Sequence, residues 1–145
     1  MLRSISVSAA ALFLLANAAS AQAPALSDAD YLKLGNQYST WLFAGNADSL
    51  AAHMADEART KSGGAAGVAD LRANLTARAG SEVWVVAEKM TRRGGNPQYW
   101  RESQFSAFAD ESLVLRWVMD ARGQIIGIGL GPLSQTPAPD SATVK

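Results

Sequence analysis

The sequence predicts an α+β domain in which N-terminal helices pack on one face of an antiparallel sheet. Apolar residues recur at helical spacing before Gly80 and alternate at strand spacing after it. The second half is divided by short turns and not by crossover helices, which favours antiparallel strands. Hydrophobic residues make up 48% of the 145 residues, so the chain can bury a core of its own.

Three helices are expected before Gly80. The first begins at Ser27, where Asp30 can complete a capping box, and it ends at Gly45-Asn46. Its inward stripe consists of Leu34, Tyr38, Trp41 and Leu42. The inward residues of the second helix are Ala47, Leu50, Ala51 and Met54. Residues 57–61 are expected to form an edge strand or an extended link, and the third helix spans about 68–79.

Four strands are expected after Gly80, separated by polar or glycine-rich turns. They cover residues 82–92, 98–109, 113–120 and 124–130. A long first helix and several long strands favour a curved sheet, which would leave a conical pocket beneath the helices. The alternative is a helical hairpin beside a flat sheet, with no cavity.

The two ends of the chain differ from this domain, which spans residues 24–133. Residues 1–23 have a basic start, an apolar stretch and small residues suited to cleavage after Ala21 or Ala23, as in a signal peptide. A buried first helix is the alternative, but such a helix would have a polar face and this segment has none. Residues 134–145 are rich in proline and polar residues, so we expect a disordered tail.

Charge and cysteine content narrow the function classes. The chain has 13 basic and 13 acidic residues and lacks the basic stripe that would indicate nucleic-acid binding. The absence of cysteine rules out disulfides, thiolate metal sites and the lipid anchor of a bacterial lipoprotein. With one histidine and no inward carboxylate pair, we expect neither a metal nor a cofactor. Together with the leader, these features predict a periplasmic or secreted protein without a membrane anchor.

Three segments carry a resemblance to a known superfamily. Residues 37–50 include an aromatic-x-Gly-Asn helix end, residues 53–58 continue it, and residues 117–127 form an apolar-Asp-x-x-Gly hairpin. In this order they resemble the nuclear-transport-factor-2-like superfamily over about residues 28–132. Tyr99-Trp100-Arg101 and the ending 128–132 are similar to an exported domain of unknown function that also occurs ahead of serine hydrolase domains. The resemblance implies a cone-shaped, cystatin-like fold.

The same resemblance allows enzymatic positions to be checked. In the ketosteroid isomerase branch, a helix tyrosine and a strand acid hold the oxyanion while a second carboxylate moves the proton. Tyr38 matches the tyrosine, but the carboxylate positions fall at Ser62 and Leu115, which cannot do this chemistry. A divergent isomerase or lyase of the SnoaL-like kind, using Tyr38 and His53, is the alternative to a non-catalytic binding domain.

Two binding surfaces are expected. One is an apolar pocket for a small hydrophobic molecule, walled by Tyr38, Trp41, Met54, Leu115 and Trp117, with Arg101 at its mouth for an acidic group. Arg101 could instead pair with Glu82, Glu88 or another carboxylate across the sheet. The other is an outer-face patch of Trp84 and Trp100, suited to a homodimer or a partner domain.

The alternating glycines of residues 127–131 do not fit a phosphate-binding loop, because no helix follows them. They predict a strand with one face stripped of side chains, so that a helix, a ligand or a partner can approach. A crowded contact within the core is the alternative explanation.

Overall fold

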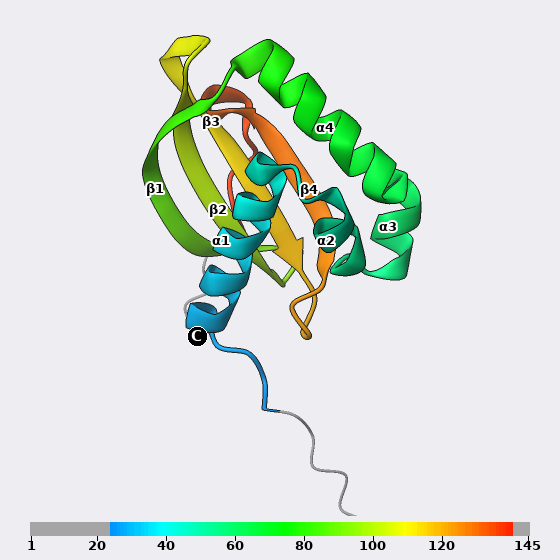
Figure 1. Cartoon of the computed structure of the whole chain (residues 1–145). Coiled ribbons are helices and arrows are strands. Elements are labelled where there is room, and N and C mark those ends of the chain that lie inside the picture. The colour runs from blue at the N-terminus through cyan, green and yellow to red at the C-terminus, as the bar shows by residue number, and fades with distance from the viewer. Residues whose placement is uncertain (1–23, 141–145) are drawn as a thin grey trace, which may run out of the picture.

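The computed structural model describes residues 24–140 and shows an α+β domain with four helices and a four-stranded antiparallel sheet in those residues (Figure 1). The helices are α1 (Asp28–Ala44), α2 (Ala47–Ala52), α3 (Asp56–Ser62) and α4 (Gly64–Ala79). The strands are β1 (Glu82–Arg93), β2 (Asn96–Phe105), β3 (Phe108–Met119) and β4 (Ile125–Pro132), paired in chain order. The expected α+β class is therefore confirmed. The predicted signal peptide lies outside the described residues.

Helix α1 begins and ends as the sequence pattern predicts. Ser27 and Asp30 form the capping box, and Gly45 adopts a left-handed conformation at the C-cap with φ of 82°. Halfway along, Gly35 allows close approach to the sheet, since a Cβ placed there would lie 2.1 Å from Cγ of Tyr99. This glycine sets how closely α1 packs on β2.

Two local predictions differ from the structure. Residues 56–62 form the short helix α3, not an edge strand or link, and exposed pairs between Asp56 and Arg59 and between Glu57 and Lys61 support it. The turn expected at residues 110–112 lies instead at Ser106-Ala107, where Phe105 pairs with Phe108. The sheet ladder therefore includes Asp110, Glu111 and Ser112, whose polar character had indicated a turn.

The main core lies between α1, α2 and the inner face of the sheet. Strand alternation places Tyr99 of β2 and Leu115, Trp117 and Met119 of β3 on this inner face. The start of β4 is joined to the helices, because the Ile125 amide donates to the His53 carbonyl at 2.9 Å. A smaller cluster beneath the end of α4 consists of Leu75, Ala79, Phe105 and Leu113.

The C-terminal segment 133–140, hereafter the C-terminal strap, follows β4 and runs along the outer face of the sheet, behind it in Figure 1. Its first part is held where the Ser134 amide donates to Glu111 at 2.9 Å. Its far end meets the β1–β2 turn, where the Asp140 amide donates to the Arg92 carbonyl at 3.0 Å. Part of the tail that was expected to be disordered therefore has defined contacts, because the sheet offers a side-chain carboxylate at one end and a backbone carbonyl at the other.

Candidate functional site

The residues predicted to wall a ligand pocket meet in the structure, but as packed core. Four of them are almost fully buried: Tyr38, Met54, Leu115 and Trp117. Trp41 is half-buried at the edge of the same cluster, and its ring centroid lies 5.8 Å from that of Tyr38. The rings of Tyr38 and Trp117 meet edge to face with centroids 6.0 Å apart. Their own side chains thus occupy the position where the hollow was expected.

The polar atoms of this core are paired internally. Trp117 Nε1 donates to Ser39 Oγ at 3.0 Å, and the Tyr38 hydroxyl donates to the Gly123 carbonyl at 2.8 Å. Burial, together with the nearby charge of Asp120, raises the pKa of Tyr38 to about 12. Tyr38 is therefore a structural hydrogen-bond donor to the β3–β4 turn, and its hydroxyl is already engaged.

Arg101 does not present a free guanidinium to a ligand. Its Nε and Nη2 donate to the two carboxylate oxygens of Glu82 at 2.9 and 2.8 Å, and its Nη1 donates to Glu88 at 2.5 Å. Burial acts to raise the pKa of Glu82, but hydrogen bonds from Arg101 and Ser103 outweigh it and lower that pKa. The alternative prediction, pairing with Glu82 or Glu88, describes the observed contacts.

His53 and Tyr38, the pair of the enzymatic alternative, lie close but are not connected by a hydrogen bond among the described residues. Their ring centroids are 5.9 Å apart. His53 is exposed at the end of α2, and its Nδ1 lies 2.8 Å from the Ser49 carbonyl. Within residues 24–140 no carboxylate contacts it, so no acid orients the ring for proton transfer.

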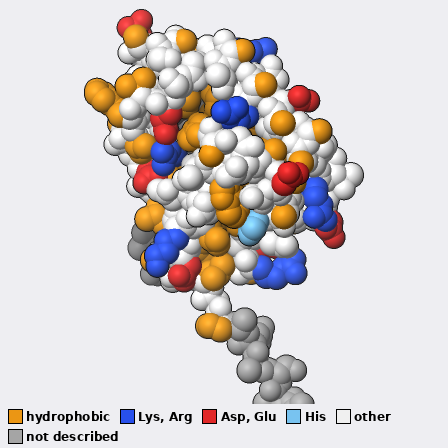
Figure 2. Space-filling model, viewed as in Figure 1, with side chains coloured by type: hydrophobic (Ala, Val, Ile, Leu, Met, Phe, Trp, Pro, Cys, Tyr) orange, Lys and Arg blue, Asp and Glu red, His pale blue; other side chains and the backbone are white. Residues whose placement is uncertain are grey.

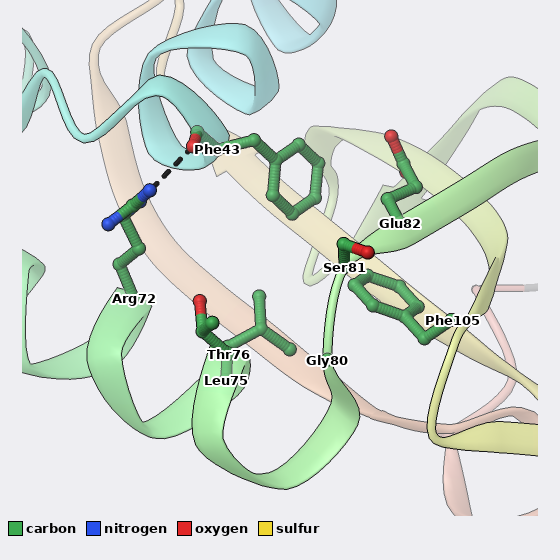
Figure 3. Close-up of a pocket in the computed structure, with 8 residues that line it drawn as sticks. All are labelled: Phe43, Arg72, Leu75, Thr76, Gly80, Ser81, Glu82 and Phe105. Atoms are coloured by element: carbon green, nitrogen blue, oxygen red, sulfur yellow. Dashed lines mark hydrogen bonds between the residues drawn. The ribbon is translucent and has the colours of Figure 1, made fainter.

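Cavities lie on both sides of Leu75 in α4. One of about 310 Å³ is lined by the end of α1, by α4 and by the start of β1, beside the rings of Phe43 and Phe105, whose centroids are 6.1 Å apart (Figure 3). Arg72 stands at its margin, where its Nε donates to the Phe43 carbonyl at 3.1 Å. The other, about 450 Å³, is a largely apolar groove between α4 and the ends of β3 and β4, with Arg78 beside it. These cavities were missed because they depend on how α4 packs against the sheet.

The most exposed apolar feature of the described residues is the β1 strip, defined as Val83, Trp84, Val85 and Val86. These four consecutive residues are 62%, 62%, 40% and 50% exposed. The strand is at the edge of the sheet, and Figure 2 shows hydrophobic side chains along the corresponding margin of the molecule. The run of four apolar residues was visible in the sequence, but its exposure follows from the edge position.

The two tryptophans predicted to share an outer patch have different environments. Trp84 pairs with Gln104 and is open to solvent, whereas Trp100 is only 5% exposed. Trp100 lies on the outer face of the sheet, and all four helices lie on the inner face. Among the described residues, the C-terminal strap is the segment that runs over the outer face (Figure 1). The predicted patch is therefore reduced to Trp84 and its neighbours in β1.

Two further searches concern residues 24–140. In that range no group of three or more His, Asp or Glu side chains is arranged to hold a metal ion. No helix in the described part of the chain is long and apolar enough to cross a membrane.

Comparison with known proteins adds no relative: no family model, no curated protein and no solved structure matches this chain. The class that the geometry defines is thus an α+β domain with a filled core and an exposed apolar edge strand.

Proposed function

We propose that this is an exported, non-catalytic association module whose contact surface is the β1 strip, and that its first partner is a second copy of the chain. The observation that carries the proposal is the exposure of four consecutive large apolar side chains on an edge strand. Soluble proteins rarely leave such a strip uncovered, because the exposed apolar area is stabilised by contact with another surface.

The geometry of β1 favours contact through side chains over a continuous strand ladder. The pairing of β1 with β2 shifts register between Glu82 and Trp84 and again between Val85 and Ala87. Such bulges bend an edge strand away from regular pairing. Four side chains also fall short of the roughly 20 residues per side in a stable interface. We therefore expect a weak, concentration-dependent dimer.

The element order supports placing the domain in the nuclear-transport-factor-2-like superfamily as part of this proposal. Helices that precede four antiparallel strands and cover one sheet face are consistent with the resemblance in residues 37–50 and 117–127. In this domain the inner space beneath α1 is filled by Tyr38 and Trp117, which favours a binding role for the surface.

Sedimentation across micromolar to millimolar concentration tests self-association. Wild-type protein should show a mass rising toward that of a dimer, and Val86→Lys should stay monomeric because a charge disrupts the apolar contact. Ile126→Lys is the matched control, since Ile126 is 37% exposed on β4, at the opposite edge of the sheet from the strip. A wild-type monomer throughout, or equal association of Val86→Lys, would refute the proposal.

Export is tested separately by N-terminal sequencing of protein recovered from the periplasm or medium of a bacterial host. Cleavage after Ala21 or Ala23 should leave a chain beginning at Gln22 or Pro24. Recovery of the chain only from the cytoplasm, with Met1 intact, would contradict export.

The 450 Å³ groove favours a second candidate function, binding of a small apolar molecule with an acidic group. Its volume falls in the range of small-molecule sites, and Arg78 can meet a carboxylate. Arg78 lines the groove from α4 and is exposed, so Arg78→Gln removes the cation without disturbing the core. Calorimetry with decanoate should show binding that Arg78→Gln weakens. Equal binding by both proteins would exclude this site.

A further inference from the structure

One row of paired residues crosses the outer face of the sheet. Lys89 of β1 pairs with Trp100 of β2, Trp100 pairs with Arg116 of β3, and Arg116 pairs with Gly129 of β4. Directly paired residues of antiparallel strands project from the same face. Two cations therefore flank one indole in this row, hereafter the outer-face row.

Among residues 24–140, polar atoms in and beside the row are buried without hydrogen-bond partners. Trp100 Nε1 and Arg116 Nε are two such donors, and Gln98 Oε1, on the same face of β2, is an acceptor. Trp100 is 5% exposed and Gln98 is 1% exposed. A buried polar group without a hydrogen bond costs about 1–3 kcal/mol, so the two donors indicate that a molecule with acceptor atoms completes this part of the site.

The charges of the row are also uncompensated. Lys89 Nζ lies 5.1 Å from the centroid of the Trp100 ring. Neither Lys89 nor Arg116 forms an ion pair with a carboxylate among residues 24–140, although Glu102 projects from the same face of β2. The pKa of Arg116 is lowered mainly by burial and secondly by repulsion from Arg93, as expected for a guanidinium without a counter-ion.

Gly129 explains how the arginine fits against the sheet. A Cβ at this position would lie 2.3 Å from Nη2 and 2.8 Å from Nε of Arg116, so the guanidinium covers a strand position that has no side chain. The sequence pattern predicted that a group would approach the glycines of β4 closely. At Gly129 this group is the guanidinium of Arg116.

The C-terminal strap runs along this face without satisfying the row. Its polar contacts with the sheet join Ser134 to Glu111, Ala138 to Arg93, and Asp140 to Arg92 and Gly95, and none of these sheet residues belongs to the row. Pro137 and Pro139, on either side of Ala138, have no amide N–H to offer to Gln98. The strap thus covers the row but does not form hydrogen bonds with the unpartnered atoms of Gln98, Trp100 and Arg116.

We propose that the outer-face row binds the carboxylate group of a small organic anion, beneath the C-terminal strap. Trp100 Nε1 and Arg116 Nε donate to the carboxylate oxygens, and Lys89 adds a positive charge at the edge of the site. A carboxylate accepts hydrogen bonds at both oxygens and carries the single negative charge that the row lacks. The strap must move outward to admit the anion, because Trp100 is covered when it is in place.

Two-dimensional NMR of the four tryptophan indole N–H groups in the full mature chain provides a direct test, with Trp100→Phe assigning the relevant signal. Sodium acetate is titrated against sodium chloride at equal ionic strength. Acetate should shift the Trp100 signal saturably, with the solvent-exposed Trp84 signal as an internal reference. Loss of a charge-assisted hydrogen bond should weaken acetate binding about tenfold in Arg116→Gln.

Two further variants keep the test decisive. Lys89→Gln removes the second cation at an exposed position that does not threaten folding, and it should also weaken binding. Arg122→Gln is the matched control, because Arg122 is exposed in the β3–β4 turn and should leave the titration unchanged. If acetate and chloride shift the Trp100 signal equally, or if Lys89→Gln titrates like wild type, water alone fills the site and the proposal is overturned.

Discussion

The Trp117 indole N–H and the Ser39 hydroxyl, 78 positions apart in sequence, form a buried 3.0 Å hydrogen bond that joins β3 to α1. Ser39 also donates to the Gly35 carbonyl one helical turn earlier, at 2.8 Å. The hydroxyl therefore satisfies the only polar atom of the largest core side chain. This bond lies where the sequence had predicted a ligand cavity.

Ser39→Ala should lower the free energy of unfolding by about 1–3 kcal/mol, because the Trp117 N–H would remain buried without an acceptor. Urea denaturation of the two proteins measures the difference. Thr40→Ala is the matched control: Thr40 makes a similar bond to the Asn36 carbonyl, but it is exposed. Its effect should stay within about 0.5 kcal/mol, and an equal loss in both variants would argue against a role for the Trp117 bond.

Gly35→Ala should destabilise the domain by about 3 kcal/mol or more, because the added methyl group overlaps the buried Tyr99 ring. Either α1 must move away from β2 or Tyr99 must leave its rotamer. Gly131→Ala provides the comparison, since its Cβ position has no atom within 4 Å. Thermal unfolding should separate the two variants by many degrees. Similar melting temperatures would show that α1 does not depend on this close contact.

Arg101→Met should cost about 3 kcal/mol near neutral pH, because Glu82 and Glu88 would lose their shared partner in a largely buried cluster. It should also change the acid response. The pKa of Glu82 is lowered in the folded protein, so its stabilising effect is complete above the ordinary value of 4.5 and is lost as the pH falls through the lowered value.

Unfolding free energies measured from pH 7 downward test this response. Wild type should lose stability steeply below about pH 4.5, and the slope should be shallower in Arg101→Met. Arg122→Met, at an exposed pair with Asp120, should keep the wild-type slope. Identical slopes in all three proteins would contradict the assignment of the acid response to the Arg101 cluster.

Alkaline conditions should weaken the fold through two tyrosines. Burial raises the pKa of both Tyr38 and Tyr99 to about 12, with a hydrogen bond to Glu88 adding to the effect for Tyr99. Since both values are raised above 10.0, their stabilising effect is complete below pH 10 and is lost as the pH approaches 12. Absorbance of tyrosinate should show two late-titrating groups, one of which disappears in Tyr38→Phe. Titration of both near pH 10 in the folded protein would refute this expectation.

The sequence by itself determined the α+β class, the limits of α1 and the pairing of long strands. These features depend on local chemistry, such as the Ser27–Asp30 capping box, the left-handed Gly45 and the strict alternation from Leu113 to Met119. Local pattern also identified Tyr38, Met54, Leu115 and Trp117 as inward residues. Whether they surround a space or fill it depends on the distance between α1 and β2, which the pattern does not contain.

Only the tertiary structure decided which apolar residues remain exposed and which polar groups are paired. Trp84 and Trp100 both lie in strands that the sequence predicts, yet one lies on an open edge and the other lies on the strap-covered outer face in the interior of the sheet. Within the described part of the chain, Arg101 pairs with two carboxylates and Arg116 with none, and this difference likewise follows from strand register. Burial and pairing are properties of residues distant in the chain, so they arise only when helices, sheet and strap come together.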